Sequence, residues 1–204
     1  MSKHHECSVN TARRRFCKLA AAGLGLLAAP AVLGSGEAGA AAPQGGRHLI
    51  AYFSRTGNTR TIAGQIQAAA GGELLELRTV TPYPEDYRAT TEQAKKELAS
   101  GYRPPLQTTP PDPAAYDVIF VGSPNWWGTI APPVMTFLTS ADFSGKTIAP
   151  FVTHGGSRLG RAVEDIKKLC SKATVLPGLA VYGESVADAQ EITAAWLRRN
   201  GLAR

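Results

Sequence analysis

A short polar segment that follows an apolar run is the part of the chain best suited to bind an anion. Residues 48–53 are apolar and aromatic, which predicts a buried strand, and a helical pattern begins at about Asn58. The first turn of a helix has unpaired N–H groups and a partial positive charge, and a phosphate group fits that environment. The residues expected to form this phosphate site are Ser54, Arg55, Thr56, Gly57, Asn58 and Thr59.

The composition of this segment restricts the kind of phosphate. No Gly-Lys-Ser/Thr follows it, so the lysine and the magnesium ligand of a nucleoside-triphosphate loop are missing. Gly57 is its only glycine, which excludes the Gly-x-Gly-x-x-Gly pattern of dinucleotide-binding folds. The hydroxyl groups suit a terminal phosphomonoester, whose oxygens accept several hydrogen bonds at once. An ordinary polar turn between a strand and a helix is the alternative.

A second segment combines turn residues with two adjacent tryptophans. It follows a continuous apolar run over residues 117–122, which predicts a buried parallel strand. Two indoles in a loop expose a large apolar area unless a partner covers them, and a flat aromatic ligand would do so by stacking. The alternative is that an indole packs in the core. The sequence leaves both possibilities, ligand stacking and core packing, open for each tryptophan. The candidate ligand-binding residues of this loop are Pro124, Asn125, Trp126, Trp127 and Gly128.

A third candidate loop follows the next predicted strand and contains two consecutive glycines. Glycines let the backbone approach a ligand closely without a steric penalty. His154 is interpreted either as a hydrogen-bond donor or proton-transfer group at the ligand, or as a structural histidine with its own partner. The candidate residues are Thr153, His154, Gly155 and Gly156. We find no nucleophile–base pair and no metal-ligand cluster in the sequence, so we predict no catalytic residue and no metal site.

The first forty residues differ in kind from the rest. Residues 12–18 match the twin-arginine export pattern, and an apolar run over residues 19–33 is interrupted by Pro30. Ala38-Gly39-Ala40 offers a small-x-small cleavage site. We therefore expect residues 1–40 to be a twin-arginine signal peptide and residues 41–204 to be a mature domain in the periplasm or outside the cell. No stable membrane span is expected after cleavage, and an uncleaved amphipathic anchor is the alternative.

Charge and cysteine content restrict the partners of this mature domain. The full chain carries +6, and the first forty residues hold five basic and two acidic side chains, so the mature domain carries +3. Such a mild excess, without a basic stripe, indicates no nucleic-acid partner. Cys170 is the only cysteine beyond residue 40, so we expect no intramolecular disulfide and a packed thiol near a helix end.

The remaining pattern alternates between strands and helices. Strands are predicted over residues 48–53, 73–80, 117–122, 147–153 and 175–182. Helices are predicted over 59–70, 86–100, 132–140 and 159–169, with a last helix that Ser185 and Asp188 cap and that ends near Asn200. This alternation predicts an α/β fold, a parallel sheet with helices on both faces. In the doubly wound strand order 2-1-3-4-5, a ligand binds at the carboxyl ends of strands 1 and 3, which the first two candidate loops follow.

Four segments in this order resemble motifs of the flavodoxin family: residues 51–59, 82–87, 124–128 and 153–157. The resemblance covers nearly all of residues 41–204 and implies a flavodoxin-like five-stranded sheet with FMN as the cofactor. It also implies that the first loop binds the FMN phosphate, that the tryptophans flank the ring, and that the third loop supplies main-chain groups to its polar edge. The chain departs from typical flavodoxins in its slightly basic charge, and its fifth strand lacks the insertion of the long-chain members.

The function that the resemblance implies is electron transfer with a redox partner protein or a small-molecule acceptor. One alternative is an FMN-dependent NAD(P)H or quinone reductase of the same fold, which needs a second pocket over the flavin. The other is a binding module that has lost its flavin, and the intact phosphate loop argues against it.

Overall fold

Alternating strands and helices form the part of the chain that a computed structural model describes, residues 46–204. The predicted signal peptide and its cleavage site lie outside the described residues. The strands are β1 (His48–Tyr52), β2 (Glu73–Glu76), β3 (Val118–Trp126), β4 (Thr129–Ile130), β5 (Thr147–His154), β6 (Thr174–Val175) and β7 (Leu179–Tyr182). The helices are α1 (Asn58–Ala70), α2 (Tyr87–Ser100), α3 (Pro132–Thr139), α4 (Ala162–Leu169) and α5 (Gln190–Arg199), with short 3-10 turns η1 (Pro113–Ala115) and η2 (Gly183–Asp188).

The strands form one sheet in the order β2-β1-β3-β5-β6, with β7 also paired to β5. These pairs are parallel, and only β4 runs antiparallel to its neighbour β3. The predicted fifth strand is split in two, because Pro177 and Gly178 separate β6 from β7 and proline has no N–H to donate to a ladder. With β6 and β7 counted as the fifth strand, the predicted order 2-1-3-4-5 is confirmed.

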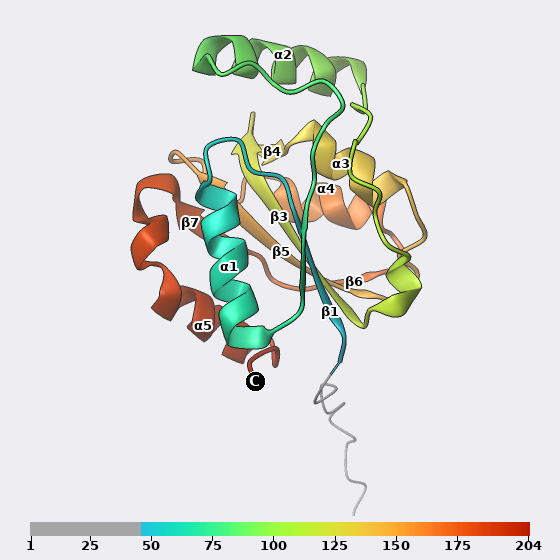
Figure 1. Ribbon diagram of the computed structural model, residues 1–204, viewed down its shortest axis with the longest axis vertical. Coiled ribbons are helices and arrows are strands. Elements are labelled where there is room, and N and C mark those ends of the chain that lie inside the picture. Colours follow the sequence, from blue (N-terminus) through green and yellow to red (C-terminus); the bar gives the residue numbers. More distant parts are fainter. Residues whose placement is uncertain (1–45) are drawn as a thin grey trace, which may run out of the picture. The chain divides into compact units, whose positions relative to one another are not determined.

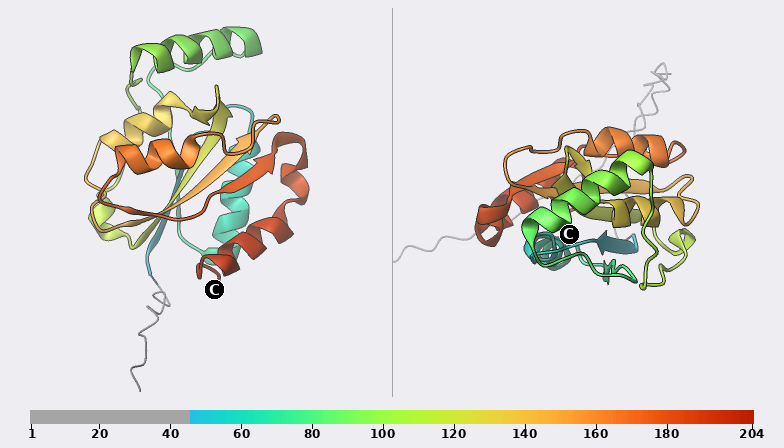
Figure 2. Two further views of the ribbon diagram at one scale, coloured as in Figure 1. Left: turned by 180° about the vertical axis from the view of Figure 1, so that it is seen from behind. Right: turned by 90° about the horizontal axis from the view of Figure 1, so that it is seen from above.

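Both faces of the sheet are buried, as expected for parallel strands. Successive side chains of β1 alternate between two apolar clusters: Leu49 and Ala51 belong to one, and Ile50 and Tyr52 to the other. The first cluster includes residues of α3 and α4, and the second includes residues of α1 and α5. Figures 1 and 2 show these two helix pairs on opposite sides of the sheet.

Helix α2 differs from the prediction that the helices cover the two faces. Figure 1 shows it beyond the ends of β3 and β4, and the view from above in Figure 2 shows it crossing that edge of the sheet. The side chain of Asp86 accepts a hydrogen bond from the Ala89 N–H (2.7 Å) at its start. Gly101 ends it in the left-handed conformation (φ 69°), which confirms the predicted C-cap. Helix α2 is therefore placed over the carboxyl edge of the sheet, where a ligand is expected.

A buried carboxylate connects α2 to the loop that precedes it. Glu97 is largely buried, and it accepts hydrogen bonds from the Tyr83 hydroxyl and from Gln93 Nε2, the latter at 2.8 Å. A buried carboxylate is tolerated only when donors surround it. Burial, and next the hydrogen bond to Glu97, raise the pKa of Tyr83, so the phenol keeps its proton and continues to donate.

Several predicted boundaries need correction. The predicted cap at Ser185 and Asp188 is wrong: residues 183–188 form η2, and α5 begins at Gln190 without a side-chain cap. The second strand ends at Glu76 instead of residue 80, and the third continues beyond residue 122 to Trp126. Among residues 46–204, the helices lack the combination of length and apolar composition that crossing a membrane requires.

Candidate functional site

The predicted phosphate loop leaves the start of α1 open. Gly57 precedes the helix with φ 94°, a conformation that glycine adopts at little cost. The Ser54 side-chain oxygen accepts a hydrogen bond from the Gly57 N–H (3.1 Å), which closes the loop on itself. No side chain caps the first turn of α1, so its N–H groups remain for an anion.

A hollow of about 480 Å³ lies at the carboxyl ends of β1, β3, β5 and β7. Most of the predicted site residues line it, and they come from all three predicted loops. They are Arg55, Thr56, Asn58, Thr59, Pro124, Asn125, Trp126, Thr153, His154 and Gly155. The structure therefore brings the three loops together at the carboxyl ends of the neighbouring strands β1 and β3, as the strand order predicts.

A second hollow, also of about 480 Å³, adjoins the first on the side of α2. The two share the residues Tyr87, Asn125, Trp126 and Gly155. The second adds Thr91 from α2, Ser157, and the remaining members of the tryptophan loop, Trp127 and Gly128. Three predicted residues line neither hollow: Ser54 and Gly57 shape the phosphate loop, and Gly156 bonds to His154.

The two tryptophans have different roles, and Trp126 does not lie in a loop as predicted. It is the last residue of β3 and pairs with Thr129 of β4. Its ring packs edge-on against Phe53 and Tyr83, with centroid distances of 5.5 and 5.0 Å. The reason is that the two-residue strand β4 pairs with Asn125 and Trp126 and so extends β3. Trp126 is therefore the indole that packs towards the core.

Trp127 points outwards and is half exposed. It forms the two-residue turn between β3 and β4 together with Gly128, and both have positive φ angles, 54° and 81°. Its Nε1 donates a hydrogen bond to the Thr91 carbonyl (2.8 Å), and Lys95 Nζ lies 4.9 Å from its ring centroid. Because both contacts are made by α2, Trp127 fixes the middle of that helix above the second hollow.

Arg55 fixes the start of α2 in a similar way. Its Nη1 donates a hydrogen bond to the Glu85 carbonyl (2.9 Å), and its guanidinium carbon lies 5.8 Å from the centroid of the Tyr87 ring. Tyr87 is 71% exposed and lines both hollows. The phosphate loop and α2 are therefore joined at the entrance of the site.

His154 is held in one orientation. Its Nδ1 lies 3.0 Å from the Gly156 N–H, which donates to it, and its ring centroid lies 5.9 Å from that of Tyr182. Burial, and next the positive charge of Arg158, lower the pKa of His154. A neutral ring that accepts at Nδ1 carries its proton on Nε2. His154 thus has a structural partner and also keeps one N–H for a ligand.

The prediction from sequence missed Tyr87 and a fourth segment, residues 182–184, which begins at the last residue of β7 and lines the first hollow. The predicted topology could have indicated this segment. In a parallel sheet the fifth strand ends at the same edge as strands 1 and 3, so the residues after it lie near the ligand. A Cβ at Gly183 would lie 2.7 Å from Asn58 Nδ2, so a larger residue here would displace the Asn58 side chain. Tyr87 lay within the motif at residues 82–87, although it was not predicted to be a site residue.

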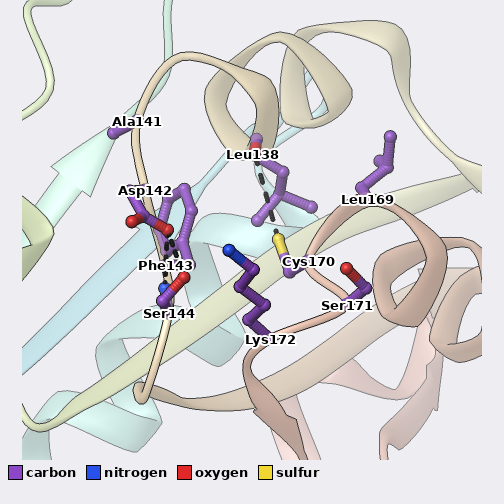
Figure 3. Close-up of a pocket in the computed structure, with 9 residues that line it drawn as sticks. All are labelled: Leu138, Ala141, Asp142, Phe143, Ser144, Leu169, Cys170, Ser171 and Lys172. Carbon is purple, nitrogen blue, oxygen red and sulfur yellow. Dashed lines mark hydrogen bonds between the residues drawn. The ribbon is translucent and has the colours of Figure 1, made fainter.

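A smaller cavity of about 160 Å³ lies at the opposite edge of the sheet, between the loops that precede β5 and β6 (Figure 3). Cys170 lines it, is buried, and donates a weak hydrogen bond from Sγ to the Leu138 carbonyl (3.8 Å). Burial raises the pKa of this thiol to about 11, so it stays protonated. This confirms the predicted packed cysteine at a helix end, and the cavity is separate from the candidate site.

Residues 47–200 match the sequence profile of the Flavodoxin family. The chain belongs to the flavodoxin family. Its structure is similar to that of a candidate flavoprotein from Bacteroides uniformis, with 30% identity and a TM-score of 0.67 over 76% of this chain and 99% of that one. It is also similar to a flavoprotein from Lactobacillus acidophilus solved in complex with FMN, with 26% identity and a TM-score of 0.60 over 72% and 99% of the two chains. A comparison with curated proteins found no match.

Proposed function

We propose that residues 41–204 form an FMN-binding electron-transfer protein that is exported to the periplasm or the cell exterior. The observation that carries the cofactor assignment is the open N-terminus of α1 beside an aromatic-walled hollow at the sheet's switch point. FMN has the matching chemistry, a terminal phosphomonoester at one end and a flat ring at the other. The solved relative from Lactobacillus acidophilus contains FMN, which supports the same assignment here.

The residues of the two hollows fit such a molecule. Thr56, Asn58 and the first N–H groups of α1 bind the phosphate, and Tyr87 and Trp127 supply exposed aromatic surface for the ring. The bound FMN supplies the exchange of electrons, and the protein binds and orients it and limits the access of water. His154 holds its remaining proton on Nε2 at the wall of the first hollow.

The cofactor assignment is tested on purified protein comprising residues 41–204. We expect a yellow protein that releases FMN on heating, identified by chromatography against FMN, FAD and riboflavin standards. Recovery of FAD alone would contradict the assignment to a phosphomonoester. A colourless protein that does not bind added FMN would favour the interpretation that the module has lost its flavin.

The second hollow favours one alternative function, an FMN-dependent NAD(P)H or quinone reductase. A reductase needs a place for its substrate beside the ring, and the part of the second hollow that the ring leaves free would supply it, because the two hollows share four residues. The two functions are separated by steady-state oxidation of NADH or NADPH in the presence of a soluble quinone. Turnover well above that of free FMN supports a reductase. Rapid reoxidation of the reduced protein by an external acceptor, without such turnover, supports an electron carrier.

A further inference from the structure

Residues 84–92, the loop before α2 and the first turns of that helix, form one wall of the second hollow. Tyr87 and Thr91 line this hollow, and Figure 1 shows α2 beyond the ends of β3 and β4. The five residues that follow Pro84 are all exposed, and Thr90 is the one buried residue of the segment. The Thr90 hydroxyl donates to the Pro84 carbonyl (2.6 Å), a contact within the segment itself. No buried apolar side chain therefore holds this wall in place.

The two ends of the segment are fixed to the core and to each other. Tyr83, just before it, donates a hydrogen bond from its hydroxyl to the buried carboxylate of Glu97. The Tyr83 ring packs edge-on against Trp126, with a centroid distance of 5.0 Å, and Ala94, just after the segment, is fully buried. Gln93 Nε2 also donates to Glu97 (2.8 Å). A segment whose ends meet in this way can move without separating the residues at its base.

Two side chains of the candidate site hold the segment from outside. Arg55 Nη1 donates a hydrogen bond to the Glu85 carbonyl (2.9 Å), and Trp127 Nε1 donates one to the Thr91 carbonyl (2.8 Å). Arg55 belongs to the phosphate loop and Trp127 to the turn between β3 and β4, so each joins the segment to a different ligand-binding loop. Hydrogen bonds near the surface are replaced by bonds to water at little net cost, and regions with few buried apolar contacts open locally.

We propose that residues 84–92 form a flap that opens and closes over the second hollow, and that Arg55 and Trp127 hold it closed. Opening breaks the two hydrogen bonds from these side chains and unwinds the first turn of α2, while the base of the flap stays in place. The side of the hollow that faces α2 then becomes open to solution and admits a ligand, which closing covers. The proposal goes beyond the proposed function, because it concerns access to the hollow and not the identity of the molecule that binds there.

The test measures hydrogen exchange of the Ala89 and Thr90 amides, which donate to the side chain and the carbonyl of Asp86 and exchange when the first turn opens. In the flavin-free protein they should exchange far faster than the central amides of α1. Trp127→Phe keeps an aromatic ring but removes the hydrogen bond, so it should speed this exchange roughly 2- to 12-fold. Arg55→Met, which keeps the length of the side chain but removes the donor, should speed it by at least as much.

Arg103→Met is the matched control, because Arg103 Nη1 donates to the carbonyls of Gly101 and Tyr102 at the other end of α2 (3.2 and 3.3 Å). It should leave the exchange of Ala89 and Thr90 unchanged. Thermal melting and the exchange of α1 are recorded for every variant, so that a global loss of stability is distinguished from local opening.

Saturating FMN should slow the exchange of the same two amides, because a ligand that contacts the flap favours its closed position. Exchange as slow as that of α1, unchanged exchange in Trp127→Phe and Arg55→Met, or an equal acceleration in Arg103→Met overturns the proposal. Bound FMN that leaves the exchange unchanged overturns it as well. A protein that binds no FMN contradicts the proposed function alone, and exchange in the flavin-free variants then decides the proposal.

Discussion

The hydroxyl oxygens of Thr59 and Thr153 lie 2.9 Å apart, although 94 residues separate them in the chain. Thr59 belongs to the first turn of α1, and Thr153 is the next-to-last residue of β5. Both are buried and both line the first hollow. A threonine hydroxyl can donate and accept at once, so when Thr153 donates, the proton of Thr59 remains for a ligand. The contact thus joins the phosphate loop to the third loop.

Removing hydroxyl groups from the phosphate loop should weaken the binding of FMN more than the binding of riboflavin. Each hydrogen bond to a charged phosphate contributes about 1.5–3 kcal/mol, so Thr56→Ala should lower FMN affinity roughly 10- to 150-fold. Thr59→Val, which keeps the side-chain shape, should have a comparable effect. Riboflavin has no phosphate, so its affinity should change little. Flavin fluorescence titration measures both.

The control for this series is Thr61→Val, because the Thr61 hydroxyl donates to the Gly57 carbonyl and does not line the hollow. It should leave both affinities close to the wild-type values. Unchanged FMN affinity in the Thr56→Ala/Thr59→Val double mutant would show that the phosphate binds elsewhere. An equal loss for riboflavin would show that the substitutions act through the structure.

The two tryptophans should respond differently to substitution. Trp126→Ala removes a ring that packs against Phe53 and Tyr83, and it should lower the free energy of unfolding by about 2–4 kcal/mol. Trp127→Ala removes a half-exposed side chain, so its effect on stability should be smaller, about 1 kcal/mol or less. Urea unfolding of the two variants measures this difference.

Flavin titration of the same variants tests the role of Trp127 in the site. Stacking of an indole on the ring contributes about 0.5–1.5 kcal/mol beyond the buried area, so Trp127→Ala should lower flavin affinity severalfold. Trp127→Phe keeps an aromatic ring but loses the hydrogen bond to Thr91, and it should recover part of that affinity. Equal flavin affinity in the wild type and in Trp127→Ala would show that Trp127 does not contribute to flavin binding.

The sequence allowed the strand order and the three loops to be predicted because these features depend on local patterns. Continuous apolar runs mark buried parallel strands, and the turn residues that follow them mark the edge where a ligand binds. Ser54, Thr56 and Asn58 were recognisable from their chemistry and from their place before a helix. Their common position in space followed from topology alone.

The parts that could not be predicted depend on contacts between distant segments. Helix α2 shows a helical pattern, but its place over the carboxyl edge is set by Glu97 with Tyr83 and by Trp127 with Thr91. The position of each tryptophan depends on the strand β4, whose two residues are too few to predict a strand. Tyr182 lines the first hollow because the register of β7 with β5 places it opposite His154.

The protonation of His154 should make the protein less stable in mild acid. Burial and Arg158 lower the pKa of His154 in the folded state below its ordinary value of 6.5. As the pH falls below about 6.5, the unfolded chain therefore binds a proton at this residue before the folded chain does. The contribution of His154 to the free energy of unfolding should decrease as the pH falls from about 6.5 to the pKa of the folded state. Above about pH 6.5 this contribution should be constant.

Protonation also removes the acceptor that Nδ1 offers to the Gly156 N–H, so flavin affinity should fall over the same pH range. Arg158→Gln should raise the pKa of His154 in the folded state towards its ordinary value, so the loss of stability in mild acid should become smaller and the fall in flavin affinity should begin at a higher pH. NMR titration of the imidazole signals measures the pKa, and His48→Gln identifies which signal belongs to His154. A signal of His154 that titrates above 6.5 in the wild-type protein would contradict this account.

Replacing Arg13 and Arg14 with lysine should trap the protein in the cytoplasm with its flavin bound. We propose that these arginines direct the chain to the twin-arginine route, which carries proteins that fold before they cross the membrane. This route suits a cofactor held only by noncovalent contacts, since an unfolded chain has no assembled phosphate loop. Cys170 is the one cysteine beyond residue 40, so folding of residues 41–204 needs no oxidising compartment to form an intramolecular disulfide.

The experiment compares cell fractions from strains that express the wild-type chain and the Arg13→Lys/Arg14→Lys variant. The variant should accumulate as an uncleaved precursor in the cytoplasm, and that precursor should release FMN on heating. Lys3→Arg is a matched control, because it changes a basic residue of the same segment outside the arginine pair and should leave export unchanged. Export of the double variant at the wild-type rate would show that the arginines act as ordinary basic residues of a general secretory signal. The chain would then cross the membrane unfolded, and it would have to acquire its flavin outside the cytoplasm.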